Sequence, residues 1–89
     1  MHDEPSGGLV LPDEEVQVGV LRHLLDLHPI QLTDEELIRE AVGDPDDFAE
    51  RDAVRRAVGV LVASGLVHRH GRFLFPTHAA LVFHALAPT

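Results

Sequence analysis

The residues of this 89-residue chain with the clearest chemical potential are its arginines. A guanidinium group can bind a phosphate, or the edge of a guanine, through two parallel hydrogen bonds. Residues 1–50 carry fourteen acids and two arginines, a charge of −12, whereas residues 51–89 carry one acid and five arginines, a charge of +4. The formal net charge of −8 therefore conceals one basic half, which is the part suited to contact a polyanion.

The other side chains suggest neither a metal centre nor a catalytic one. His68 and His70 occupy alternate positions and would face one side of a strand, but a zinc site needs three or four ligands, and no further acid or histidine stands at a spacing that completes the set. The chain has no cysteine, and Ser6 and Ser64 stand in no nucleophile motif. We predict no metal, no cofactor and no enzymatic activity.

The length and the terminal segments favour one small domain. A chain of 89 residues has room for a single core. Residues 1–8 are polar and rich in glycine, and we expect a disordered tail there, while the apolar segment 9–12 can pack as an extended arm on this subunit or on a neighbour. Because the start of the chain lacks the features of a signal peptide and no apolar run approaches 20 residues, we expect a cytoplasmic protein.

Three helices are predicted in the first two thirds of the chain. Asp13 is a good N-cap for a helix that ends before His28-Pro29. Thr33 and Glu36 form the capping box of a second helix, which Gly43 is suited to close in a left-handed conformation. Asp47 repeats the capping signal for a third helix, which should stop at Gly65.

The pattern changes after the third helix. Residues 66–70 and 72–75 read as two short strands joined by a tight turn at His70-Gly71. Thr77 can cap a last helix over residues 78–86.

Residues 53–67, with the sequence AVRRAVGVLVASGLV, resemble the junction between recognition helix and wing in the winged helix-turn-helix superfamily. The Gly65-Leu66-Val67 step is the strongest cue, and the order helix, helix, turn, helix, hairpin extends the resemblance over about residues 13–75. The resemblance implies a mainly α fold with a small β-hairpin: a three-helix core, a two-stranded wing and a C-terminal helix, all within residues 9–89. It also implies that the leucine after the glycine fills the core.

The resemblance implies sequence-specific binding of duplex DNA by a small transcription regulator, with the third helix in the major groove and the wing on the neighbouring phosphates. At 100° per residue the outward face of that helix carries Asp52, Arg56, Gly59 and Ala63, with Arg51 and Arg55 beside it. Asp52 opposes this function unless it pairs with an arginine or reads a cytosine. The candidate DNA-binding residues are Arg51, Arg55, Arg56, Gly59, His68, Arg69, His70 and Arg72.

The last predicted helix is apolar on nearly every side, which indicates burial against another surface. One interpretation is a homodimer, in which two third helices lie about one turn of DNA apart on a roughly palindromic site. The other is that this helix covers the open side of its own core. The candidate dimerisation residues are Leu81, Val82, Phe83 and Leu86.

A second function class is consistent with the same residues. The superfamily also contains domains that bind only proteins, and the acidic first half, including Glu35, Glu36 and Glu40, could dock a basic partner as a non-catalytic interaction module. The two functions differ in one structural requirement. DNA binding requires the positive charge to share one outward surface, and it is excluded if the guanidinium groups are scattered to different sides or tied up internally with carboxylates.

Overall fold

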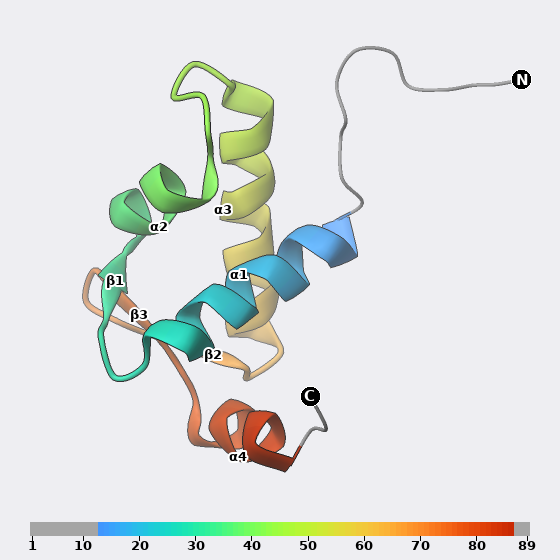
Figure 1. Cartoon of the computed structure of the whole chain (residues 1–89), viewed down its shortest axis with the longest axis vertical. Helices are drawn as coiled ribbons and strands as arrows, with labels where there is room; N and C mark the ends of the chain where they lie inside the picture. Colours follow the sequence, from blue (N-terminus) through green and yellow to red (C-terminus); the bar gives the residue numbers. More distant parts are fainter. Residues whose placement is uncertain (1–12, 87–89) are drawn as a thin grey trace, which may run out of the picture.

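The computed structural model describes residues 13–86, so the expected tail at 1–8 and the apolar arm at 9–12 lie outside the described residues. Four helices and three short strands follow one another along the chain (Figure 1). They are α1 (Asp13–Leu27), β1 (Leu32–Thr33), α2 (Asp34–Ala41), α3 (Phe48–Ala63), β2 (Val67–His70), β3 (Phe73–Pro76) and α4 (His78–Leu86). The protein is therefore mainly helical with a small antiparallel sheet.

A local signal accounts for the N-terminal end of the short helix α2 but not for its C-terminal end. The capping box is confirmed, because Glu36 N–H donates to Thr33 Oγ1 at 3.1 Å and Thr33 N–H donates to Glu36 Oε1 at 2.9 Å. The prediction for Gly43 was wrong, since the left-handed glycines among the described residues are Gly65 and Gly71. The helix ends instead at Val42, which has extended backbone and whose N–H still donates to the Ile38 carbonyl at 2.9 Å.

The turn between α2 and α3 is made by acidic residues. Asp46 N–H donates to Asp44 Oδ1 at 2.9 Å, and Glu50 N–H donates to Asp47 Oδ1 at 3.0 Å, so Asp47 caps α3 as predicted. Side chains that accept from their own backbone are typical of turns and N-caps. The turn thus places several carboxylates at the N-terminus of α3.

The far end of α3 is closed by Gly65. Its φ of +84° is the left-handed conformation that glycine adopts without steric cost. The N–H of Gly65 donates to the Val62 carbonyl at 3.1 Å and the N–H of Leu66 to the Leu61 carbonyl at 3.0 Å, which satisfies two carbonyls at the helix end. The predicted stop is confirmed, and the chain then enters β2.

The sheet has three strands in the order β1-β3-β2, so the prediction of two strands was incomplete. The hairpin of β2 and β3 is present as expected, with Gly71 at φ +61° in its turn. The additional strand is β1, where Leu32 lies opposite Leu74 and Thr33 opposite Phe73. Two residues are too few to show an alternating pattern, and Thr33 had been assigned only as a helix cap.

The core lies between the sheet and the first three helices. Leu24, Leu37 and Leu74 are 0% exposed and come from α1, α2 and β3 respectively. The residue that is fully buried after Gly65 is Val67, at 2% exposure, whereas Leu66 is half-buried against the core. The role that the resemblance gave to Leu66 is therefore filled mainly by Val67, the first residue of β2.

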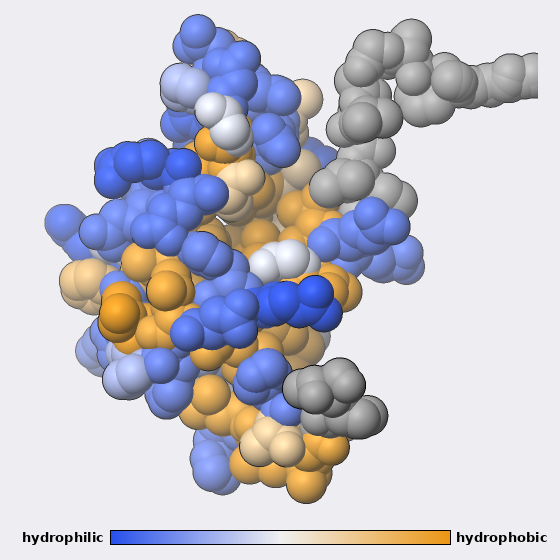
Figure 2. Space-filling view, viewed as in Figure 1, coloured by the Kyte–Doolittle hydropathy of each residue, from blue (hydrophilic) through white to orange (hydrophobic). Residues whose placement is uncertain are grey.

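The C-terminal helix begins and ends where the sequence indicates. Thr77 Oγ1 accepts from Ala80 N–H at 3.2 Å and donates to the Gly65 carbonyl at 2.8 Å, which ties the start of α4 to the end of α3. In the space-filling view, hydrophilic residues cover α2 and the N-terminal part of α3, and apolar residues gather over α4 (Figure 2). Across residues 13–86 there is no helix with the length and apolar character that crossing a bilayer requires.

Two glycines allow a test of these helix assignments. Gly59 lies within α3 with open space around it, so Gly59→Ala should raise the free energy of unfolding by about 1 kcal/mol. Gly65→Ala should lower it by about 1–2 kcal/mol, because a side chain is strained at positive φ even where space is open. Urea denaturation followed by circular dichroism measures both values. Shifts of the same sign in the two variants would contradict the assignment of α3.

Candidate interaction surface

The outward face of α3 holds the residues that the helical periodicity placed there. Asp52, Arg56, Gly59 and Ala63 are all exposed. Val60, which is 46% exposed, adds an apolar side chain to the exposed part of the helix. This outward face thus combines one acid and one arginine with small or apolar residues, and it has no formal net charge.

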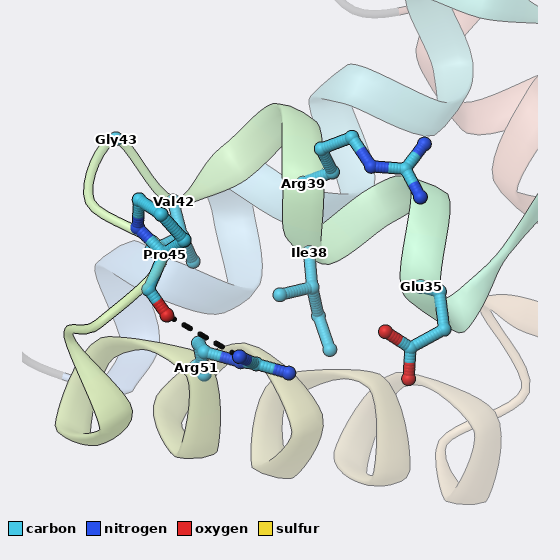
Figure 3. Close-up of a pocket in the computed structure, with 7 residues that line it drawn as sticks. All are labelled: Glu35, Ile38, Arg39, Val42, Gly43, Pro45 and Arg51. Carbon is cyan, nitrogen blue, oxygen red and sulfur yellow. Dashed lines mark hydrogen bonds between the residues drawn. The ribbon is translucent and has the colours of Figure 1, made fainter.

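Arg51 does not lie on that face. Its Nη1 donates to the Pro45 carbonyl at 3.3 Å, and its Cζ lies 5.9 Å from the centre of the Phe48 ring. The side chain runs beneath Ile38 along a hollow of about 310 Å³ between α2 and α3 (Figure 3). Its Nε is buried and has no hydrogen-bond partner among the described residues. The sequence placed Arg51 beside the outward face, whereas the structure directs it towards α2.

Arg55 and Arg56 are exposed but each has a carboxylate neighbour. Arg55 Nη1 lies 3.5 Å from Asp52 Oδ1, one helical turn earlier. Arg56 Nη2 lies 3.5 Å from Oδ1 of Asp13, at the start of α1. Asp52 therefore pairs with an arginine. This is one of the two arrangements in which the sequence analysis accepts an acid on a DNA-binding surface.

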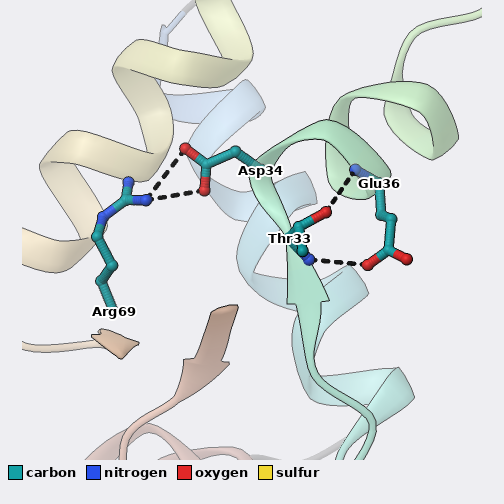
Figure 4. A network of polar contacts seen from close by, with 4 residues as sticks. All are labelled: Thr33, Asp34, Glu36 and Arg69. Carbon is teal, nitrogen blue, oxygen red and sulfur yellow. Dashed lines mark hydrogen bonds and ion pairs between the residues drawn. The ribbon is translucent and has the colours of Figure 1, made fainter. Parts of the chain in front are cut away.

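Arg69 makes the best-formed ion pair of the described residues. Its Nη1 donates to both carboxylate oxygens of Asp34, at 2.9 and 3.1 Å (Figure 4). Asp34 is the first residue of α2, next to the capping box of Thr33 and Glu36. The pair joins β2 to α2, and neither partner is fully exposed, with side-chain exposures of 41% and 39%.

The remaining candidate DNA-binding residues of the hairpin are His68, His70 and Arg72. The rings of His68 and His70 are stacked with centroids 6.4 Å apart, so the two imidazoles share one side of β2 as expected. Arg72 has no carboxylate within 4.0 Å among residues 13–86. It lines a second hollow together with Arg69 and with two acids of α2, Asp34 and Glu35. The hairpin thus presents its positive charge beside negative charge.

A contrasting surface surrounds the turn between α2 and α3. Asp44, Asp46, Asp47 and Glu50 are all exposed, and Phe48 among them is 67% exposed. The adjoining hollow has walls of Ile38, Val42 and Pro45, and its charged lining residues are Glu35, Arg39 and Arg51 (Figure 3). We call this region the acidic turn surface, and define it as residues 35, 38, 42 and 44–50. The sequence predicts Glu35 in an acidic interaction surface, whereas turn and cap chemistry alone accounts for the turn acids in the sequence.

The acidic residues that the sequence proposed for a protein partner differ in exposure. Glu35 and Glu40 are exposed, and Glu40 pairs with His23 of α1, whereas Glu36 is half-buried in its capping box.

The candidate dimerisation residues of α4 also differ in exposure. Val82, Phe83 and Leu86 are exposed, but Leu81 is half-buried. Ala79 is exposed instead and was missed, because the helical pattern alone does not tell which side the domain covers.

The described residues contain no cluster of three histidine or acidic side chains that could hold a metal ion. No protein-family model matches the chain, and neither the curated proteins nor the solved structures include a significant match.

Proposed function

We propose that this chain is a non-catalytic protein-interaction module on a winged-helix scaffold, and that its acidic turn surface binds a basic segment of a partner protein. The observation that carries the proposal is the pairing of the arginines. Arg55, Arg56 and Arg69 each face a carboxylate, and Arg51 is directed into the hollow beside α2. Each of these guanidinium groups would have to leave its present neighbour to contact a phosphate, which favours a protein partner over DNA.

The winged-helix part of the proposal rests on element order. α1, α2, the acidic turn, α3 and the β2–β3 hairpin follow one another as in that superfamily, with β1 as an added edge strand. In this scaffold the N-terminal half of α3 would approach a DNA groove first. Here that end is surrounded by Asp44, Asp46, Asp47 and Glu50, which would repel phosphates.

The same acids favour a partner of opposite charge. Carboxylates at an exposed turn attract lysine and arginine side chains and speed their encounter. Phe48 and the apolar walls of the hollow supply contact area that a purely electrostatic surface lacks. The partner segment that fits both features carries basic residues on either side of an apolar side chain.

A defined peptide tests this surface. The probe is an acetylated and amidated peptide of four arginines around a central leucine, titrated into the full chain and followed by calorimetry at low salt. We expect binding that weakens as salt screens the charges, and that is at least about tenfold weaker in both Glu35→Lys and Asp46→Lys. Asp26→Lys is the matched control, because it makes an equal charge change near the C-terminal end of α1, outside the acidic turn surface. Equal weakening in all three variants would contradict a defined surface.

Duplex DNA binding is retained as a second candidate because of the hairpin. Arg72 has no carboxylate partner among the described residues, and His68 and His70 lie on the same hairpin. Exposed ion pairs at 3.5 Å contribute only about 0–1 kcal/mol, so a phosphate could displace Asp52 from Arg55. This candidate predicts duplex affinity that falls steeply with salt and is lost in Arg55→Glu.

A further inference from the structure

The outer face of α4 carries a complete apolar stripe. Ala79, Val82, Phe83 and Leu86 follow the spacing i, i+3, i+4, i+7, which places them on one side of a helix. Val82 is 43% exposed, Phe83 71% and Leu86 75%. Figure 2 shows apolar residues gathered in this region. We call these four residues the outer α4 stripe.

The domain itself covers only the opposite side of α4. Ala80 is 2% exposed and Leu81 is half-buried, so the inward side is already packed against the rest of the chain. The interpretation that α4 closes its own core thus accounts for Ala80 and Leu81. Within residues 13–86 it leaves the two largest exposed side chains of the helix, Phe83 and Leu86, without a contact that would bury them.

We propose that the outer α4 stripe binds the same stripe of a second copy of this chain across a two-fold axis. A two-fold contact brings one patch against itself, so the patch must be self-complementary. α4 contains no acid and no arginine, and no acid follows Asp52 anywhere in the chain. The stripe residues themselves can therefore meet their copies without desolvating a charge or placing like charges opposite each other.

Charge also argues against the other exposed aromatic surface as the contact between copies. Phe48 is 67% exposed, close to the value for Phe83, but it is surrounded by Asp46, Asp47 and Glu50. A two-fold contact at Phe48 would place these acids against their own copies. The two phenylalanines thus form a matched pair with opposite expected behaviour.

This inference concerns a different surface from the acidic turn surface and does not depend on it. The effect of salt separates the two. Each copy carries a formal charge of −8, so added salt screens repulsion between copies and should leave the dimer unchanged or tighten it. Binding of the basic probe should weaken under the same change.

Sedimentation equilibrium on the full chain tests the proposal. We expect a transition from the 9.8 kDa monomer to twice that mass, with a dissociation constant on the order of 10–100 µM, as suits a small apolar contact. Phe83→Asp and Leu86→Asp should each weaken self-association at least about tenfold, with circular dichroism spectra unchanged because both positions are exposed.

Phe48→Asp is the control and should leave the monomer–dimer transition in place. The proposal is overturned if the unaltered chain remains monomeric up to about 500 µM, well above the expected dissociation constant. It is also overturned if Phe48→Asp disrupts self-association as strongly as Phe83→Asp, or if the folded Phe83→Asp and Leu86→Asp variants still associate like the unaltered chain.

Discussion

Leu74→Ala is expected to lower the free energy of unfolding by about 2–5 kcal/mol, the cost of removing a buried leucine side chain and leaving a cavity. Leu74 is 0% exposed and lies on β3, the strand that pairs with both β1 and β2. A domain of this length is typically stable by only about 4–13 kcal/mol. The variant should therefore lose between about one sixth and all of that stability, as urea denaturation followed by circular dichroism would show.

Phe73→Ala is the matched control for that experiment. Phe73 precedes Leu74 on the same strand but points to the other side of the sheet and is 40% exposed. Although phenylalanine is the larger side chain, its removal should cost less than the removal of Leu74. A larger loss in Phe73→Ala than in Leu74→Ala would mean that β3 is in a different register.

Replacing the three paired aspartates should turn the chain into a duplex binder. The combined variant Asp13→Asn, Asp34→Asn and Asp52→Asn removes the carboxylates that face Arg56, Arg69 and Arg55. Each released guanidinium can then neutralise a DNA phosphate and displace a counterion. We expect affinity for a random 20-base-pair duplex to rise at least about tenfold at low salt, as measured by fluorescence anisotropy.

The control has the same net charge but leaves the ion pairs intact. Glu14→Gln, Glu15→Gln and Asp26→Asn remove three exposed carboxylates that form no ion pair within residues 13–86. If the pairs themselves restrain the arginines, this variant should gain clearly less affinity than the first. An equal gain in both would mean that net charge, and not pairing, limits contact with DNA.

Sequence signals that act over a few residues predicted much of the fold. The Thr33–Glu36 capping box, the Gly65 stop and the helix over 78–86 are all present where the residue types indicate. In each of these the capping partners lie within five residues of each other, so the energetics are set locally. The hairpin turn at Gly71 was predicted for the same reason.

Features that depend on distant partners could not be predicted in this way. The strand β1 forms only because Leu32 and Thr33 pair with Leu74 and Phe73, which lie far away in the sequence. Arg69 and Asp34 are separated by 35 residues, and nothing near either of them indicates that they pair. Strand pairing and ion pairing at this range are set by the packed core.

The candidate site likewise has some features that local patterns predict and others that depend on the packed domain. Helical periodicity placed Asp52, Arg56 and Gly59 outward correctly, because it needs only the position of the core. It did not show that Arg51 turns into the hollow beside α2, since that depends on the Pro45 carbonyl in the preceding turn and the Phe48 ring at the start of α3. Likewise, only the packed domain shows that Ala79 faces outward and Leu81 inward on α4.

The most direct test of the central claim, that paired arginines and turn acids keep this protein off DNA, is the anisotropy of the unaltered chain with a random duplex at about 20 mM salt. Non-specific DNA-binding proteins reach dissociation constants of about 1–100 µM even at physiological salt. We predict no saturable binding below about 100 µM protein, even at the low salt that favours it. Binding in the low micromolar range that weakens steeply with salt and disappears in Arg55→Glu would contradict the account and assign the surface to nucleic acid.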